Sequence, residues 1–303
     1  MTRFTQTSAA FHPGKLRVWL QLFRAPNLFT VPGDPLSGYL LAVRGSIDTG
    51  VFLAMAASLC FYAGGLLMND LADFSEDLRE RPSRPLPSGT AGKRQVQLAA
   101  VLLMLAGLGF CMWRSEAFFV GLLLSGMIAT YNFWSKRIAL IGAINMGACR
   151  GLSLLLGATI AGFVTTPVIA AAILLTLYVA AITNLSRSET KATVPFFAKI
   201  LPLLTVLGGA IAFPIREPHV NAHTFYAFYA VAIVACASVT ARTLRNAQTP
   251  LPPIIGALIR VLLLVQAAFC AGSNTGWFGG APALVLLALV PISRLVGRRF
   301  YAS

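Results

Sequence analysis

Long apolar segments recur along the whole chain and constrain the fold more than any other feature. Ten can be recognised, at residues 16–43, 51–68, 96–112, 117–134, 138–163, 168–183, 196–213, 225–239, 254–270 and 280–296. Most approach the roughly 20 apolar residues that a helix needs to cross a bilayer. Only helices and closed barrels satisfy their backbone hydrogen bonds in lipid, and the segments lack the two-residue alternation of barrel strands. The sequence therefore predicts an all-α, polytopic transmembrane protein.

The charged residues agree with this prediction and suggest an orientation. Only 11% of the 303 residues are charged, too few to cover the surface of a water-soluble protein of this size. If the N-terminus is cytoplasmic and all ten segments cross, only Arg44, Arg114 and Arg216 lie on the far side among the loop Lys and Arg residues. This bias is typical of cytoplasmic loops facing anionic lipid, so the net charge of +14 does not indicate nucleic acid binding. We expect one membrane domain over residues 1–303, with the bilayer as its partner.

The acidic residues are concentrated at one place. Five of the ten fall between Asp70 and Glu80, where the second apolar segment leaves the membrane. If the helix continues through this stretch, Asp70, Asp73 and Asp77 share one face. Three carboxylates in a row repel each other, and a divalent cation is the simplest compensation. Mg²⁺ typically uses one or two carboxylates together with substrate phosphates.

Arginine follows the carboxylates directly. Arg81 and Arg84 stand in a turn containing Pro82, Pro85 and Pro87, where guanidinium groups could bind phosphate oxygens. A solvated charged loop without chemical importance is the competing interpretation. The complete pattern N-D-x-x-D-x-x-x-D followed by R-P-x-R-P-x-P-S-G is too specific for that alternative, and it indicates a diphosphate site.

These motifs resemble those of the UbiA superfamily of intramembrane prenyltransferases. Residues 69–77 match the first aspartate motif of that family, and residues 81–89 match the segment that follows it. The resemblance implies a bundle, usually of nine helices, around a central cavity that opens to the bilayer and has a cytoplasmic polar cap, so that nine to ten helices are expected here. It further implies Mg²⁺ on Asp70, Asp73 and Asp77, with a prenyl diphosphate and a hydrophobic acceptor as substrates, and substrate-binding roles for Asn69, Arg81 and Arg84.

The resemblance also implies substrate-facing roles for Asn27, Tyr131, Lys136, Asn145 and Arg150. Arg150 and Asn145 lie inside an apolar segment, where an Arg is costly unless it faces a cavity or a partner. For Asn27, which follows a proline, a helix cap is an alternative role. Tyr131 and Lys136 could instead be an interfacial aromatic and a basic membrane anchor.

One part of the family pattern is missing. The family carries a second aspartate motif after its sixth helix, and residues 182–192 contain no aspartate. Asn184 and Ser188 occupy the equivalent positions, and Glu189 is the only carboxylate, so a second Mg²⁺ would be held weakly or not at all. Arg187 and Lys191 could neutralise the diphosphate instead. Short strings here and in 146–151 are similar to the EboC-like branch of the superfamily, which is associated with export of secondary metabolites.

Two functions therefore compete. The first is Mg²⁺-dependent transfer of a prenyl group to an aromatic or lipid-like acceptor, with Glu189 as the candidate base, at the cytoplasmic face of a bacterial-type inner membrane. The second is a catalytically altered relative that binds or exports an isoprenoid or amphipathic metabolite. The missing second motif favours the binding protein, whereas the complete first motif favours the enzyme.

Overall fold

Helices account for all ten of the apolar segments. The computed structural model describes residues 14–43, 48–188, 194–218, 220–245, 250–273 and 276–300. The helices are α1 (Lys15–Leu22), α2 (Ala25–Leu28), α3 (Gly33–Ala42), α4 (Gly50–Ala72), α5 (Phe74–Glu80), α6 (Lys93–Cys111), α7 (Ser115–Phe133), the short 3₁₀ helix η1 (Ser135–Arg137), α8 (Ala139–Ala161), α9 (Thr166–Ser186), α10 (Phe196–Ala212), α11 (Ala222–Arg245), α12 (Leu251–Gly272) and α13 (Trp277–Phe300). The predicted all-helical class is confirmed.

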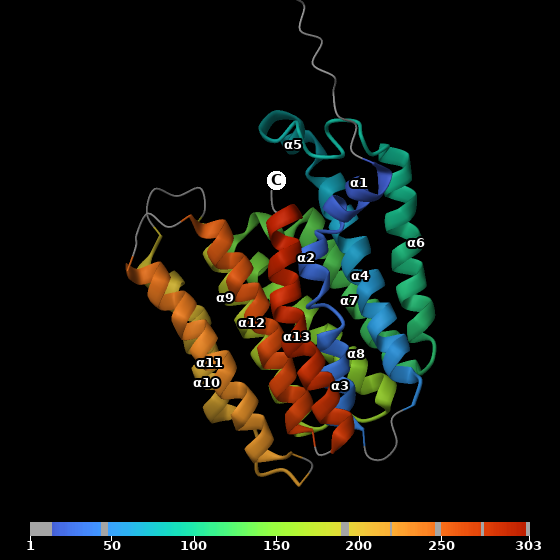
Figure 1. Ribbon diagram of the computed structural model, residues 1–303. Helices are drawn as coiled ribbons and strands as arrows, with labels where there is room; N and C mark the ends of the chain where they lie inside the picture. The colour runs from blue at the N-terminus through green and yellow to red at the C-terminus, as the bar shows by residue number, and fades with distance from the viewer. Residues whose placement is uncertain are drawn as a thin grey trace, which may run out of the picture.

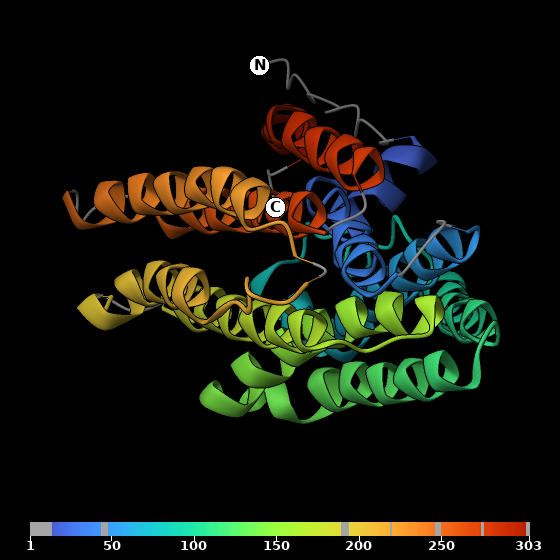
Figure 2. The same cartoon turned by 90° about the horizontal axis from the view of Figure 1, so that it is seen from below.

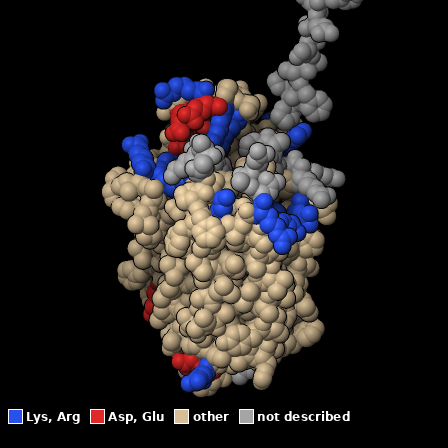
Figure 3. All heavy atoms as spheres, turned by 90° about the vertical axis from the view of Figure 1, so that its left-hand side faces the viewer, with Lys and Arg blue, Asp and Glu red and all other residues tan. Residues whose placement is uncertain are grey.

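The long helices lie side by side as a membrane-spanning bundle (Figure 1). Within the described ranges, eight helices are long and apolar enough to cross a bilayer, and α10 is a shorter apolar helix. Most charged side chains gather at the two ends of the bundle in Figure 3, and the surface between them is almost entirely uncharged. Large apolar side chains of that surface face outward, as Leu98, Leu102 and Leu105 of α6 do, each more than half exposed. The protein is therefore an integral, multi-pass membrane protein.

The first apolar segment is not one continuous helix. It is divided into α1, α2 and α3, with turns at residues 23–24 and 29–32. Pro26 and Pro32 explain the division, because proline lacks an amide donor and restricts the residue before it. Within the described ranges, Arg24 is the only residue other than glycine with a positive φ, at 46°. This conformation turns the chain between α1 and α2.

The last helix packs against the broken first segment. Helix α13 packs beside α2, and Oγ of Ser293 donates a hydrogen bond to the carbonyl oxygen of Pro26 at 3.0 Å. In the view from below, α13 lies next to the first helices, so the bundle is closed (Figure 2). Helix α12 is the most enclosed of the membrane helices and packs against α3, α9, α11 and α13.

Helices α3 and α8 pack with their backbones in close contact. A Cβ atom at Gly157 would overlap the carbonyl oxygen of Pro35, and one at Gly38 would overlap that of Leu154. Small residues that allow close helix approach are typical of membrane interfaces. This contact fixes the first half of α3 against the C-terminal part of α8.

The acidic segment forms a cap over one end of the bundle. Helix α4 ends at Ala72 and α5 begins at Phe74, so the single continuous helix considered for residues 70–77 is not present. Helix α5 lies above the end of α4 in Figure 1. The proline-rich segment that follows is held down by Leu86 and Ala91, which are buried in a cluster with Leu67 of α4 and Val96 of α6. The cap is thereby attached to the membrane helices.

Candidate functional site

A deep cavity lies beneath the cap. Its volume is about 890 Å³, and its wall comes mainly from α4, α7, α8 and α9. Along α4 the lining residues are Ser58, Phe61, Tyr62, Gly65, Leu66, Asn69 and Ala72, followed by Asp73 just beyond its end. This spacing of three and four places them on one helix face. Ser58 and Asp73 are 15 residues apart in the sequence, so the cavity extends about 22 Å along the bundle.

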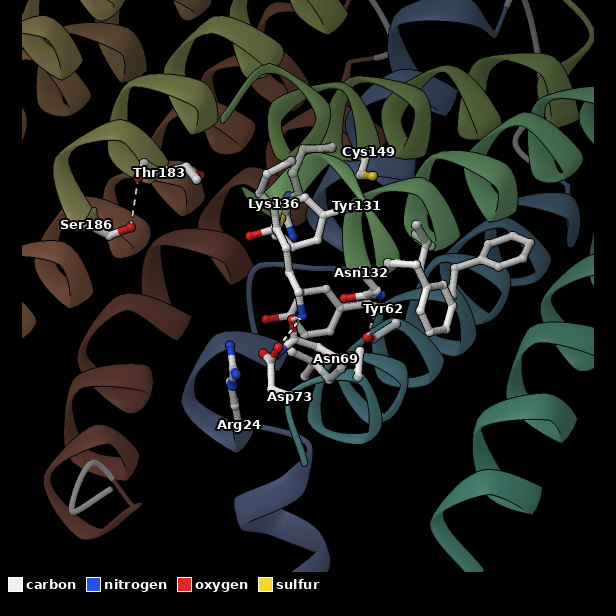
Figure 4. Close-up of a pocket in the computed structure, with 18 of the residues that line it drawn as sticks. Arg24, Tyr62, Asn69, Asp73, Tyr131, Asn132, Lys136, Cys149, Thr183 and Ser186 are labelled. Carbon is white, nitrogen blue, oxygen red and sulfur yellow. Dashed lines mark hydrogen bonds and ion pairs between the residues drawn. The ribbon is translucent and has the colours of Figure 1, made fainter. Parts of the chain in front are cut away.

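The mouth of the cavity holds a cluster of Asp73, Asn69 and Lys136 (Figure 4). Nζ of Lys136 forms an ion pair with Oδ1 of Asp73 and lies 3.4 Å from Oδ1 of Asn69. Nδ2 of Asn69 donates to Oδ2 of Asp73 at 3.1 Å. Asn69 lies one helical turn before Asp73 and Lys136 comes from η1, so two separate elements form the cluster. Three predicted site residues are therefore brought together.

Asp70 lies beside this cluster under Arg24. Nη2 of Arg24 is 3.8 Å from Oδ1 of Asp70, whose side chain is only 15% exposed. Asp70 also experiences the charges of Asp73, Asp77 and Arg84. Left-handed backbone costs about 1–2 kcal/mol for a residue with a Cβ, and such strain tends to persist at functional sites. Here it places the guanidinium of Arg24, which lines the cavity, at the acidic motif.

Asp77 takes a different position from the other two aspartates. It is buried at 5% exposure, and Nη1 of Arg84 donates to its two carboxylate oxygens at 3.0 and 2.8 Å. This pair joins α5 to the proline-rich segment of the cap. Of the three aspartates, only Asp73 lines the cavity, and no three acidic, His or Cys side chains in the described residues are grouped as a metal cluster. The three carboxylates were predicted to share one helix face. They do not, because the helix breaks at Asp73.

Other predicted residues divide between the wall and its support. Arg81, Tyr131 and Arg187 line the cavity. Nη2 of Arg187 also donates to the carbonyl oxygen of Lys136 at 2.6 Å, which ties the end of α9 to η1. Asn145 is buried and hydrogen-bonded to Oγ of Ser135 at 2.8 Å, so it holds η1 against α8.

The remaining predicted residues lie away from the wall or outside the described ranges. Asn27 lies next to the side chain of Tyr62, which does line the cavity. Asn184 is half-buried near the end of α9, and Ser188 is buried. Glu189 and Lys191 fall in the segment that the structure does not describe.

The inner end of the cavity contains a buried polar group that we did not predict as a unit. Nε of Arg150 lies 2.7 Å from Oδ2 of Asp34, which is completely buried. Nε2 of Gln266 donates to Oδ1 of Asp34 at 2.6 Å and to the carbonyl oxygen of Thr30 at 2.8 Å. Nη2 of Arg150 donates to the same carbonyl at 2.8 Å. Arg150 was predicted to need a cavity or a partner, and it has both.

The signal for this group was present in the sequence. Asp34 is an acidic residue inside the first apolar segment, and an acid at that depth requires a partner. Gln266 carried no comparable signal, because the carbonyl that it binds is free only where the first helix is broken.

The residues at the mouth fit one Mg²⁺ ion. Carboxylate and amide oxygens are the hard donors that Mg²⁺ prefers, and it commonly uses one or two carboxylates and completes its shell with phosphate and water. Asp70, Asp73 and Asn69 supply such donors within one helical turn, and cations already balance both carboxylates. The described part of the α9 end, including Asn184 and Ser188, offers neutral oxygens and no carboxylate.

Comparison with known proteins points to one family. The model of the UbiA prenyltransferase family matches residues 35–276. Digeranylgeranylglyceryl phosphate synthase of Ignicoccus hospitalis is 34% identical over 94 residues, covering 31% of this chain and 30% of that protein. The enzyme of the same name from Thermococcus gammatolerans is 30% identical over 154 residues, covering 49% of this chain and 54% of the relative. The matches thus span about a third to a half of these curated relatives.

Solved structures share the fold. A structure described as digeranylgeranylglyceryl phosphate synthase in membranes aligns with a TM-score of 0.64 at 21% identity, over 86% of this chain and 98% of the other. A UbiA homologue from Archaeoglobus fulgidus bound to GPP and Mg²⁺ aligns with a TM-score of 0.60 at 13% identity, over 83% and 98%. The apo UbiA homologue from Aeropyrum pernix K1 gives 0.65 at 15%, over 80% and 96%. The predicted UbiA-like bundle is confirmed.

Proposed function

Because the chain belongs to the UbiA prenyltransferase family, we propose that it transfers a prenyl group from an isoprenoid diphosphate to an acceptor within the membrane, with Mg²⁺. The observation that carries this proposal is the cluster of Asn69, Asp73 and Lys136 at the mouth of the cavity. Below it the wall continues with Leu66, Ile128 and two tyrosines, Tyr62 and Tyr131. A charged mouth above an apolar and aromatic chamber suits a substrate with a diphosphate head and a hydrocarbon chain.

The residues at the mouth would hold the diphosphate. Asp70 and Asp73, with the amide of Asn69, are the proposed Mg²⁺ ligands, and Asp77 supports them through the cap by its ion pair with Arg84. When bound, Mg²⁺ neutralises charge that develops on the leaving diphosphate. Lys136, Arg81 and Arg187 line the same region and would donate hydrogen bonds to phosphate oxygens. Contacts with Asp73 and with a backbone carbonyl hold Lys136 and Arg187 in place before the reaction, which is the arrangement that stabilises a leaving anion most effectively.

The chamber would carry the prenyl chain and the reactive carbon. The allylic C–O bond breaks with its electron pair leaving on the diphosphate, and the acceptor forms the new bond to that carbon. The faces of Tyr62 and Tyr131 would stabilise the positive charge on the allylic carbon, and the apolar wall excludes water. The acceptor proton must pass to a base, and we propose Glu189 for that role, on its place in the sequence next to the α9 end.

The location and the acceptor follow from other observations. The Lys and Arg bias of the loops supports a cytoplasmic mouth, in a bacterial-type cell membrane. Relatives named digeranylgeranylglyceryl phosphate synthase support a lipid-like acceptor, and an aromatic acceptor is the other candidate.

A second function is favoured by one observation. The α9 end carries Asn184 and Ser188 where a second acidic motif would stand, so the site would bind diphosphate with fewer carboxylates. A protein that binds or exports an isoprenoid or amphipathic metabolite could use the same cavity without turnover.

The two functions separate in one experiment. Purified protein in detergent is incubated with Mg²⁺ and radiolabelled geranyl or geranylgeranyl diphosphate, together with candidate aromatic and glyceryl lipid acceptors, and released pyrophosphate is measured. Release that requires Mg²⁺ and disappears in Asp73→Ala supports the enzyme. Saturable binding of the diphosphate without release under all conditions would contradict it and support the binding protein.

A further inference from the structure

The inner end of the cavity is lined by charged side chains. A chamber that held only a hydrocarbon chain would be lined by apolar side chains there. Arg150 is only 8% exposed and lines the cavity together with Asp34, Ser58 and Ser153. The two serine hydroxyls are hydrogen-bonded to each other at 2.6 Å. Arg150 lies eleven residues after the first residue of α8, about 16 Å from the mouth end of that helix. Burying such groups costs free energy unless they are partnered, so their presence requires an explanation.

The fixed contacts of Arg150 leave part of its guanidinium unused. Nε and Nη2 are directed to Asp34 and to the carbonyl oxygen of Thr30. Nη1 has no hydrogen-bond partner among the residues that the structure describes. Guanidinium N–H groups are strong hydrogen-bond donors, and in a cavity that excludes water they favour a ligand that carries a hydrogen-bond-accepting oxygen. The contacts with Asp34 hold the group still, so binding a ligand would cost little side-chain entropy.

The charge balance selects the class of ligand. Asp34 and Arg150 carry opposite charges, and the other charged residues of the described cavity wall lie at or near the mouth. A carboxylate or phosphate at the inner end would have no net positive charge to compensate its desolvation. A hydroxyl or carbonyl oxygen needs only a donor, which Nη1 supplies. Ser58, Ser153 and Cys149 offer further polar contacts on the same side of the cavity.

We propose that the inner end of the cavity is a binding site for a neutral hydroxyl or carbonyl group of the acceptor, bound by Nη1 of Arg150, with Asp34 and Gln266 as positioning residues. That the bound molecule is the prenyl acceptor rests on the proposed function, whereas the binding of a neutral polar group at this site does not. The site would place the acceptor below the diphosphate, with its reactive atom toward the apolar middle of the cavity.

Cys149 provides a measurement that does not depend on turnover. Cys149 lines the cavity (Figure 4) and directly precedes Arg150, another lining residue, in the sequence. In a variant with Cys60, Cys111, Cys236 and Cys270 replaced by alanine, the rate of alkylation of Cys149 by N-ethylmaleimide is followed by mass spectrometry. The probes are benzyl alcohol, which is neutral, and benzoate, which has the same ring and a carboxylate. We expect the alcohol to slow alkylation in a saturable manner and the carboxylate to protect at least about tenfold less well at equal concentration.

Variants of the arginine test the assignment. Arg150→Lys keeps a cation beside Asp34 but removes the second donor branch, so protection should weaken on the order of tenfold. Arg114→Lys is the matched control at the opposite end of the bundle, where Nε of Arg114 donates to the carbonyl oxygen of Ile160. If Arg150→Lys does not fold, Asp34→Asn combined with Arg150→Met removes both charges and should abolish protection.

Two results would overturn the proposal: equal protection by alcohol and carboxylate, or full protection in the Arg150 variants. Released pyrophosphate is measured on the same preparation. Protection without pyrophosphate release would leave the inner site standing and count against the proposed function. Pyrophosphate release without Arg150-dependent protection would support the proposed function and contradict the inner binding site.

Discussion

Replacing Asp34 by alanine should destabilise the protein far more than removing an ordinary hydrogen bond. Its carboxylate is fully buried, accepts from Nη2 of Arg150 at 3.2 Å and from Nε2 of Gln266 at 2.6 Å, and lies 2.7 Å from Nε of Arg150 in the ion pair. Without it, the buried guanidinium of Arg150 keeps one partner, the carbonyl oxygen of Thr30, which Gln266 also binds. Removing one member of a buried ion pair costs about 3–5 kcal/mol. The unfolding equilibrium should therefore shift by roughly 150- to 5,000-fold.

Reversible unfolding in mixed detergent micelles, followed by far-UV circular dichroism, measures this change. Ser58→Ala is the matched control, because it removes one buried hydrogen bond to Ser153 and should cost about 0.5–1.5 kcal/mol. Asp34→Asn combined with Arg150→Met removes both charges and should restore most of the stability lost in Asp34→Ala. The reasoning is refuted if Asp34→Ala costs no more than Ser58→Ala, or if the double variant is as unstable as Asp34→Ala.

Three further predictions concern the mouth and the packing of the bundle. Asp73→Asn should abolish Mg²⁺-dependent pyrophosphate release, because it removes a proposed ligand charge, while Glu116→Gln, on an exposed side chain at the opposite end, should leave release unchanged. Lys136→Met should raise KM for the prenyl diphosphate about tenfold or more through loss of a charged hydrogen bond, whereas Lys93→Met, whose ammonium lies over the ring of Phe74, should not; equal KM values would contradict the role of Lys136. Gly157→Leu should prevent folded protein from accumulating, as judged by size-exclusion chromatography in detergent, because the side chain would overlap Pro35, while Gly126→Leu, which has open space, should be tolerated.

The sequence predicted the mouth of the cavity better than its inner end. The pattern at residues 69–77 includes Asn69 and Asp73, which both line the cavity, and Lys136 joins them there from a distant segment. Spacing alone could not reveal that the helix breaks at Asp73 and sends Asp77 to Arg84, because that choice depends on tertiary ion pairs. Pro26 and Pro32 were visible in the first apolar segment, yet its length favoured one continuous helix.

Asn145 and Gln266 are polar residues inside apolar segments whose partners the sequence could not reveal. Asn145 is hydrogen-bonded to Ser135, which holds η1 against α8. Gln266 completes a network with Asp34 and Arg150. A side chain's partner decides its role in each case, and the partner is set by how helices far apart in sequence pack.

The acceptor shared by Arg150 and Gln266 is a main-chain carbonyl, that of Thr30, freed where the first helix is interrupted. A carbonyl belongs to every amino acid, so position 30 can vary over evolution among side chains of similar size without removing this contact. Positions 150 and 266 have no such freedom, since only their side chains reach that oxygen. Among homologues that keep the interrupted first helix, we expect the residue type to vary at position 30 and to stay Arg at position 150 and Gln at position 266.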